Sequence, residues 1–323
     1  MNPKLTQKTA LFVENVNIIR KDKNLKRIRG LDNRAVSFLY AAHNQKIDRD
    51  IFMNSFTLFG NNYSLSSILR STRVLYTGAA LSLEKDSSAV FEQFKVVIEL
   101  MGEAGFLADS NFIGVAAYLI ATRAEPADYQ SVVERAYGYY NEFKKRPHFL
   151  ASESQYPYMA LFGLSDIDVS DGLMRLEQLY QQYMSRLPNA SQTNIQNLVE
   201  VLFLIGEDED RILSSINALE KIKRPDRFSM FTAGYLSSIP KDAGTLADEI
   251  NEMQKYLRKQ RGFKLVSKVN LYLAAAALVA NTYASEGSPL FDLIIACYFA
   301  FAFNPNVNPP RQEGSPVTKR SLN

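Results

Sequence analysis

Residues 173–187 read LMRLEQLYQQYMSRL, and their apolar side chains recur at steps of three and four. Leu173, Leu176, Tyr180, Tyr183 and Leu187 share this spacing, which places side chains on one face of an α-helix. The positions between them are mostly Gln, Arg, Glu and Ser, as in a helix that buries one face and exposes the other. The stretch therefore predicts an amphipathic helix that packs against neighbouring helices.

Comparable apolar stripes return along the chain after about residue 60. Their starting points lie roughly 34 to 44 residues apart, and each follows a shorter apolar segment and a turn. A repeat of this length is typical of stacked helix pairs, and no strand-like alternation accompanies a hairpin turn. The sequence therefore predicts an all-α protein, an array of antiparallel helix hairpins in a solenoid-like superhelix without a sheet. The other stripes are Phe91, Phe94, Val97, Ile98 and Met101; Tyr129, Val132, Val133, Ala136, Tyr137 and Tyr140; Ile212, Ile216 and Leu219; and Leu246, Ile250, Met253 and Leu257.

The chain is expected to divide into an N-terminal helical subdomain, the hairpin array and a tail. Residues 1–60 begin with a helical pattern that stops at Gly30, and further helices are expected near residues 34–42 and 48–59. Residues 61–303 hold the repeated pairs. Residues 304–323 are rich in proline and polar residues. They bury too little apolar surface to offset the entropy of ordering, so a disordered tail is expected.

Polar residues mark the expected starts of several helices, because their side chains accept hydrogen bonds from free backbone N–H groups. Ser170 is expected to cap the helix of residues 173–187, and Asp208 and Asp210 bring carboxylates to the start of the helix that contains Ile212. Thr245 resembles the first residue of a capping box for the stripe that begins at Leu246.

Two strongly apolar segments, residues 271–280 and 290–303, are each shorter than the roughly 20 residues that a membrane-spanning helix needs. The second also carries Asp292. We therefore expect a buried helical hairpin that closes the array and no transmembrane span; contact with a membrane is the alternative. A single cysteine and the lack of a secretory pattern at the N-terminus favour a cytoplasmic location.

The net charge of +3, from 37 basic and 34 acidic residues, is small for a nucleic-acid binder. Basic residues are nevertheless concentrated between Arg20 and Arg34. Such a run is commonly a solvated helix end, where cations interact favourably with the helix dipole. Phosphate binding, by a nucleic acid or at a membrane surface, is the other interpretation of this segment.

The sequence contains no recognisable catalytic, metal-binding or cofactor-binding motif. His43 and His148 are far apart and are interpreted as exposed loop residues, and no HExxH, CxxC or glycine-rich phosphate loop occurs. The acidic residues 207–210 lack the spaced ligands of a calcium loop. Cys297 lies in the most apolar segment and is expected to be a buried thiol rather than a nucleophile. No cofactor or metal is expected, and enzymatic activity is left open.

Tyrosine is abundant, with 17 copies, and several lie in adjacent repeats. Rigid amphipathic side chains suit the binding of a partner polypeptide in a groove. Tyr156 and Tyr158 are the preferred candidates because they flank Pro157, outside a regular helical stripe. The alternative is packing between repeats, with each hydroxyl reaching the surface. The predicted partner-binding set is Tyr137, Tyr140, Tyr156, Tyr158, Tyr180 and Tyr183.

Several short segments together resemble an uncharacterised, all-helical bacterial family from Bacillus-like Firmicutes, domain-of-unknown-function family 4003 (DUF4003). They are residues 36–42 (VSFLYAA), 67–70 (SILR), 105–106 (GF) and 154–161 (SQYPYMAL). The resemblance spans most of residues 1–303. It implies a cytosolic bacterial protein without an assigned reaction, and it supplies no site residues.

The leading functional prediction is a non-catalytic scaffold or protein-interaction module that binds a protein or peptide, because helical arrays present long grooves. One alternative is an enzyme or small-ligand binder with a pocket between helices. Another is a nucleic-acid or membrane-surface adaptor that uses the basic segment from Arg20 to Arg34. Nucleic acid is not expected to be the main partner.

Overall fold

A computed structural model describes residues 2–60, 72–107, 110, 112–206, 208–222 and 229–302. All regular secondary structure in these ranges is helical, and no strand occurs there. The all-α prediction is therefore confirmed. The expected tail, residues 304–323, lies outside the described residues, as does most of the segment that follows Gly60.

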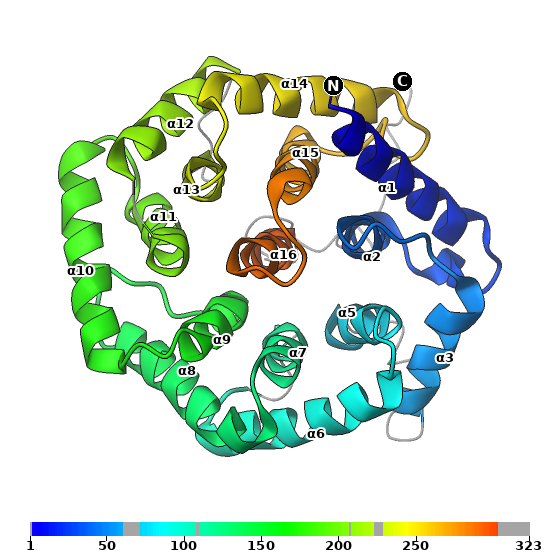
Figure 1. Ribbon diagram of the computed structural model, residues 1–323, viewed down its shortest axis with the longest axis horizontal. Coiled ribbons are helices and arrows are strands. Elements are labelled where there is room, and N and C mark those ends of the chain that lie inside the picture. Colours follow the sequence, from blue (N-terminus) through cyan, green and yellow to red (C-terminus); the bar gives the residue numbers. More distant parts are fainter. Residues whose placement is uncertain are drawn as a thin grey trace, which may run out of the picture.

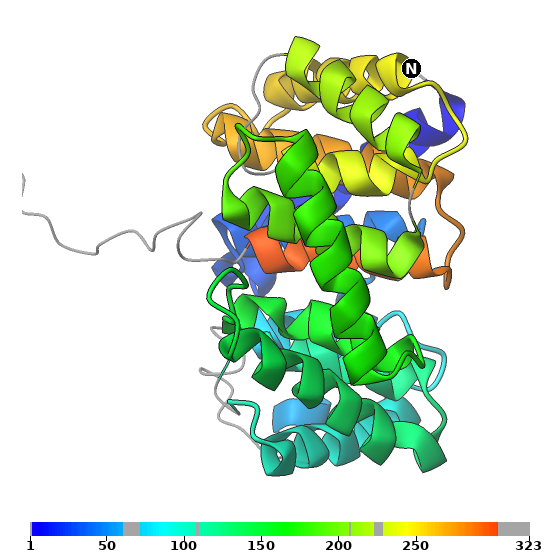
Figure 2. The same ribbon diagram turned by 90° about the vertical axis from the view of Figure 1, so that its left-hand side faces the viewer.

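The helices form two concentric rings around a central helix, and the chain alternates between the rings (Figure 1). Seen edge-on, the rings make a flat body with α10 crossing its front (Figure 2). The outer helices are α1 (Pro3–Lys21), α3 (Arg49–Gly60), α6 (Ser87–Ala104), α8 (Tyr129–Lys144), α10 (Val169–Arg186), α12 (Glu209–Lys221) and α14 (Ala243–Lys259). The inner helices are α2 (Gly30–Ala42), α5 (Thr72–Leu81), α7 (Ile113–Arg123), α9 (Tyr156–Leu164), α11 (Gln192–Ile205), α13 (Ser229–Ser237) and α15 (Lys268–Tyr283). Short 3-10 turns are η1 (Leu25–Arg27), η2 (Pro126–Asp128) and η3 (Glu153–Gln155).

The ring closes where the first helices meet the last ones. Helix α1 packs against α15, and α2 packs against both α15 and α5. Across this seam the Thr9 hydroxyl donates to the Met253 sulfur at 3.3 Å, and the rings of Phe12 and Phe263 lie 5.4 Å apart. The solenoid with a continuous groove is therefore not confirmed, and residues 1–60 contribute to the same ring as the repeats. Closure buries apolar side chains that an open end would expose to water.

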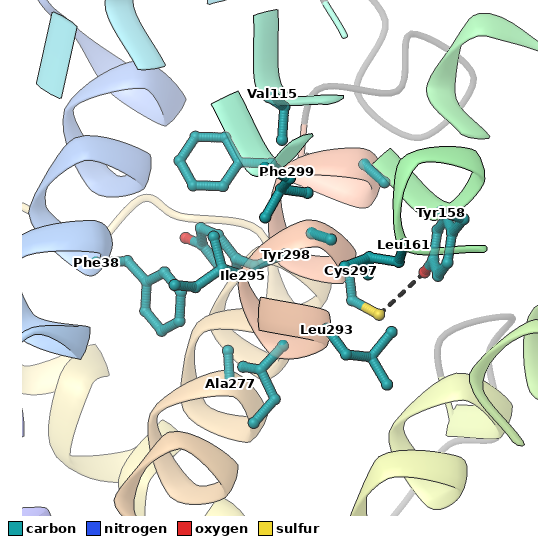
Figure 3. Packing of buried hydrophobic residues seen from close by; sticks show 14 of the residues in the cluster. Phe38, Val115, Tyr158, Leu161, Ala277, Leu293, Ile295, Cys297, Tyr298 and Phe299 are labelled. Atoms are coloured by element: carbon teal, nitrogen blue, oxygen red, sulfur yellow. Dashed lines mark hydrogen bonds between the residues drawn. The ribbon is translucent and has the colours of Figure 1, made fainter. Parts of the chain in front are cut away.

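Helix α16 (Pro289–Ala302) fills the centre of the ring, in contact with α2, α9, α11 and α15. All of residues 291–300 are buried. Figure 3 shows its side chains between the inner helices, with Tyr298 beside Phe38 at a ring separation of 4.3 Å. The predicted buried hairpin of residues 271–280 and 290–303 is thus confirmed over the described residues. None of the described helices combines the length and the apolar character needed to cross a membrane.

The outer and inner helices differ in how they are buried. Each stripe predicted from the sequence lies on an outer helix and faces the inner ring; Leu176 of α10, for example, is fully buried while Met174 is exposed. Inner helices are covered on all sides, as in α9, where residues 156–163 are all buried. An outer helix has one solvent face, so its apolar residues keep a helical period, whereas a fully covered helix loses that period.

Three expected helix ends require correction. Gly30 starts α2, with φ 57°, instead of ending the preceding helix, which stops at Lys21. Helix α10 is capped by Asp168, whose carboxylate accepts from the Ser170 N–H at 2.8 Å, and α14 is capped by Asp242 in the same way. In both cases the predicted cap residue lies within the first turn, where its own N–H needs an acceptor. Asp208 does cap α12, as predicted.

Candidate functional site at the start of the central helix

Two adjoining cavities open beside the first turn of α16 and share Arg123, Gly287 and Asp292 in their walls. The larger cavity has a volume of about 540 Å³ and lies between α9, α11 and the α15–α16 turn. The smaller cavity has a volume of about 210 Å³ and lies between α2, α5 and α7. Ring closure around α16 creates both, because the central helix begins among the ends of inner helices from distant parts of the sequence.

Arg123 and Asp292 form the shared wall. Arg123 is the last residue of α7, and its Nε and Nη2 donate to the two carboxylate oxygens of Asp292 at 2.6 and 2.8 Å. Asp292 is only 5% exposed and lies in the first turn of α16. Its hydrogen bonds raise the pKa of Arg123. This two-point geometry fixes both side chains, and each charge also lies at the helix end that favours it.

The smaller cavity has a polar wall of hydrogen-bonded pairs. The Tyr118 hydroxyl donates to the Glu84 carboxylate at 2.5 Å, and His43 Nδ1 lies 2.6 Å from a carboxylate oxygen of Glu286. Tyr76 is also in this wall and is 1% exposed. Burial raises the pKa of both Tyr76 and Tyr118. Their hydroxyls therefore stay protonated, and that of Tyr118 donates its proton to the hydrogen bond with Glu84.

The larger cavity is mainly apolar and carries one available cation. Its walls include Leu161, Phe203 and Pro289. The Arg175 guanidinium lies 5.5 Å from the centre of the Phe203 ring, and no carboxylate pairs with it within the described part of the chain. Gly206 lines the same space with φ 87°, and nothing lies within 4 Å of the position that a Cβ would occupy. The cavity thus combines apolar walls with a positive charge at its edge.

The predicted tyrosine set lies in packing between helices. Tyr140, Tyr156, Tyr158, Tyr180 and Tyr183 are all buried, and Tyr137 is half-buried. Tyr137, Tyr140 and Tyr156 surround Phe106 at ring distances of 5.3, 5.9 and 4.8 Å. Tyr156 and Tyr158 lie in α9, which begins at Tyr156, has Pro157 in its first turn and shows no regular stripe because residues 156–163 are all buried. Proline is tolerated there since it lacks only an N–H that is free anyway.

The two histidines are also placed differently from the prediction. His43 is half-buried in the wall of the smaller cavity, and His148 is half-buried with Nε2 2.9 Å from Glu177. Neither is a freely exposed loop residue. They do not share a site, since His148 packs on Phe149 and Tyr180.

Cys297 has the buried environment expected of it. The thiol is 1% exposed and accepts a hydrogen bond from the Tyr158 hydroxyl at 3.0 Å (Figure 3). Burial raises its pKa to about 12, so the reactive thiolate is scarce near neutral pH.

The acidic run 207–210 is explained by helix capping and pairing where it is described. Asp208 caps α12, and Glu209 pairs with Arg186 at 3.0 Å; Glu207 lies outside the described residues. Across the ranges that the structure describes, no group of three or more His, Cys, Asp or Glu side chains is arranged to hold a metal ion.

The sequence analysis missed the residues of both cavities, although Asp292 carried a signal. A charged residue inside a strongly apolar helix is seldom buried without a partner. Nothing local identified that partner, because Arg123 lies 169 residues away.

A sequence model described as "Protein of unknown function (DUF4003)" matches residues 19–298. The chain belongs to the DUF4003 family. The DUF4003 match begins within α1, ends within α16 and includes every residue that lines the two cavities. No curated protein and no solved structure matches the chain.

Proposed function

We propose that this protein binds a small molecule with an apolar body and an anionic group in the larger cavity beside α16. The observation that carries the proposal is the unpaired Arg175 at the edge of apolar walls, next to the fixed Arg123–Asp292 pair. A volume of about 540 Å³ lies in the range of small-molecule sites. Apolar surface supplies affinity in such sites, and a few placed polar groups set orientation.

Catalysis on the same ligand is a second candidate, favoured by the polar wall of the smaller cavity. His43 with Glu286 and Tyr118 with Glu84 are hydrogen-bonded pairs of groups that can donate or accept protons. The two cavities share the Arg123–Asp292 wall. A ligand in the larger cavity would therefore lie next to these groups.

Protein or peptide binding stays a prediction. The interior face of the ring, where a groove was expected, is occupied by α16. Most of the predicted tyrosine set is buried. A bacterial, cytoplasmic protein remains our proposal for origin and location, supported by the single buried thiol and by the sequence resemblance.

The proposal is tested with two probes of equal chain length, decanoate and decanol. We expect the protein to bind decanoate about tenfold more tightly, a difference of about 1.4 kcal/mol, because only the carboxylate pairs with Arg175. Arg175→Gln should abolish this preference and leave decanol binding unchanged. Isothermal titration calorimetry measures both affinities.

Arg186→Gln is the matched control, since Arg186 lies on the same helix but outside the cavity. A second variant, Leu164→Phe, narrows the cavity and should weaken both probes. The cavity is not the site if neither probe binds. It is also not the site if the Arg175 and Arg186 variants lose affinity for decanoate equally.

A further inference from the structure

A third cavity, here called the seam cavity, lies where α1 and α2 meet the loop between α14 and α15. Its volume is about 360 Å³. Arg20 comes from the end of α1, Lys26 from η1, Arg29 from the link into α2, and Arg34 from α2. Gly262, from the α14–α15 loop, completes the wall. Ring closure therefore gathers the basic segment of the sequence around one open pocket.

The lining of the seam cavity is positively charged and contains no carboxylate. Among the described residues no acidic side chain forms an ion pair with any of the four cations; Arg29 Nε donates to the Lys26 carbonyl at 3.1 Å. Asp32 lies close enough to Arg34 to interact with its charge but does not line the cavity. The lining thus carries four cations and no carboxylate.

The Arg34 side chain contains a buried hydrogen-bond donor that lacks an acceptor. Its Nε is buried and has no hydrogen-bond partner within the described part of the chain. A buried donor without an acceptor costs roughly 1–3 kcal/mol, and native structures contain few of them. Because Arg34 also lines the seam cavity, an anion bound there would lie beside this guanidinium.

The backbone around the cavity is shaped to hold these cations. Gly262 has φ 98°, and a Cβ at this position would lie 2.8 Å from Arg20 Nη1. Any larger residue would therefore displace the guanidinium. Asn33 is buried and donates to the Val16 carbonyl at 3.2 Å, which fixes α2 against α1 beneath the cavity. Arg29, at the N-cap of α2, makes no side-chain capping bond, so the first N–H groups of the helix receive no cap from it.

We propose that the seam cavity binds the phosphate group of a small phosphorylated molecule. Three guanidinium groups and an ammonium converge there, and the planar guanidinium matches the oxygens of phosphate. A nucleic acid or a membrane surface would be bound by cations spread along an open face. Here the four cations line one pocket of about 360 Å³, which is the size of a small-molecule site and favours a small ligand.

The test is calorimetric titration with pyrophosphate and with inorganic phosphate at constant ionic strength. We expect both to bind, and both to raise the melting temperature because they bind only the folded chain. Arg34→Gln and the double variant Arg20→Gln/Arg29→Gln should each lower the affinity by about tenfold or more. Arg20 and Arg29 are exposed, so the double variant should fold even if Arg34→Gln does not.

Arg27→Gln is the matched control, because Arg27 is an exposed cation of the same segment that does not line the cavity. The affinity of the Arg27→Gln protein for both anions should stay within about twofold of the wild-type affinity. Absence of binding to either anion at millimolar concentration would overturn the proposal. So would tight binding of a short RNA, or of phosphatidic acid vesicles, that Arg27→Gln weakens as much as the cavity variants do.

Discussion

Asp292 and Glu200 are both buried carboxylic acids near α16, but their neighbours differ. Asp292 forms a two-point ion pair with Arg123. Glu200, on α11, is fully buried, and within the described ranges it receives hydrogen bonds only from the side-chain amides of Gln196 and Gln155, at 2.7 and 2.8 Å. Its Oε2 has no partner among the described residues. Burial raises the pKa of Glu200 to about 8, so it is mainly protonated at neutral pH.

The difference shows what separates a site from a core in this fold. A cationic partner accompanies the acid that lines the cavities, whereas amide donors accompany the acid that is enclosed by packed helices. The carboxyl group of Asp292, where α16 begins at the edge of the ring interior, is ionised and paired. The carboxyl group of Glu200, deeper inside, is mainly neutral. The same helix thus meets a charged region at its start and a neutral one further along, near Cys297 and Tyr158.

The largest expected effect comes from breaking the ion pair. Arg123→Met leaves Asp292 buried without its partner and should reduce the free energy of unfolding by about 3–5 kcal/mol. The double variant Arg123→Met/Asp292→Leu should recover most of this loss, because no charge is then buried alone. Urea unfolding of the three proteins measures the effect. A loss below about 1 kcal/mol in the single variant would mean that water reaches Asp292.

A smaller effect is expected from the pH dependence of Glu200. Its folded pKa of about 8 exceeds the ordinary value of 4.5, so between these values the native state holds a proton that the unfolded chain has released. Stability from this group is present in full below pH 4.5 and is lost as pH rises through 8. We expect the free energy of unfolding to fall by a few kcal/mol over this window, and Glu200→Gln to flatten the fall. An unchanged slope in the variant would show that Glu200 is not the group responsible.

The smallest effect concerns the hydroxyl of Tyr158. Tyr158→Phe removes the hydrogen bond to Cys297 while keeping the ring, and should cost about 1 kcal/mol of stability. Tyr256→Phe, at an exposed tyrosine, is the control and should change nothing measurable. Combining Tyr158→Phe with Glu200→Gln in a double-mutant cycle shows whether the two groups are coupled. If the two losses of stability are additive, the Tyr158 hydroxyl is not coupled to Glu200 and does not belong to the neutral region around it.

The local sequence pattern predicted the helices well but did not identify the residues that line the two cavities. The stripe at Leu176 identified an outer helix because the alternation of buried and exposed faces is written into neighbouring residues. Local pattern does not decide the role of the tyrosines, since Tyr158 is apolar enough to be core and polar enough to bind a partner. Composition does not distinguish these two roles; the burial of its ring by packed helices does.

The sequence by itself determined the all-α class, the outer helices and the burial of most of residues 271–280 and of residues 291–300, since each depends on side-chain periodicity or hydropathy along a short stretch. Only the tertiary structure decided that the helix pairs close into a ring and that α16 fills its centre. It also decided that Arg123 meets Asp292 and that the basic segment from Arg20 to Arg34 lines a cavity together with Gly262. These features join residues far apart in the chain, and their energies come from packing and charge pairing that no local pattern records.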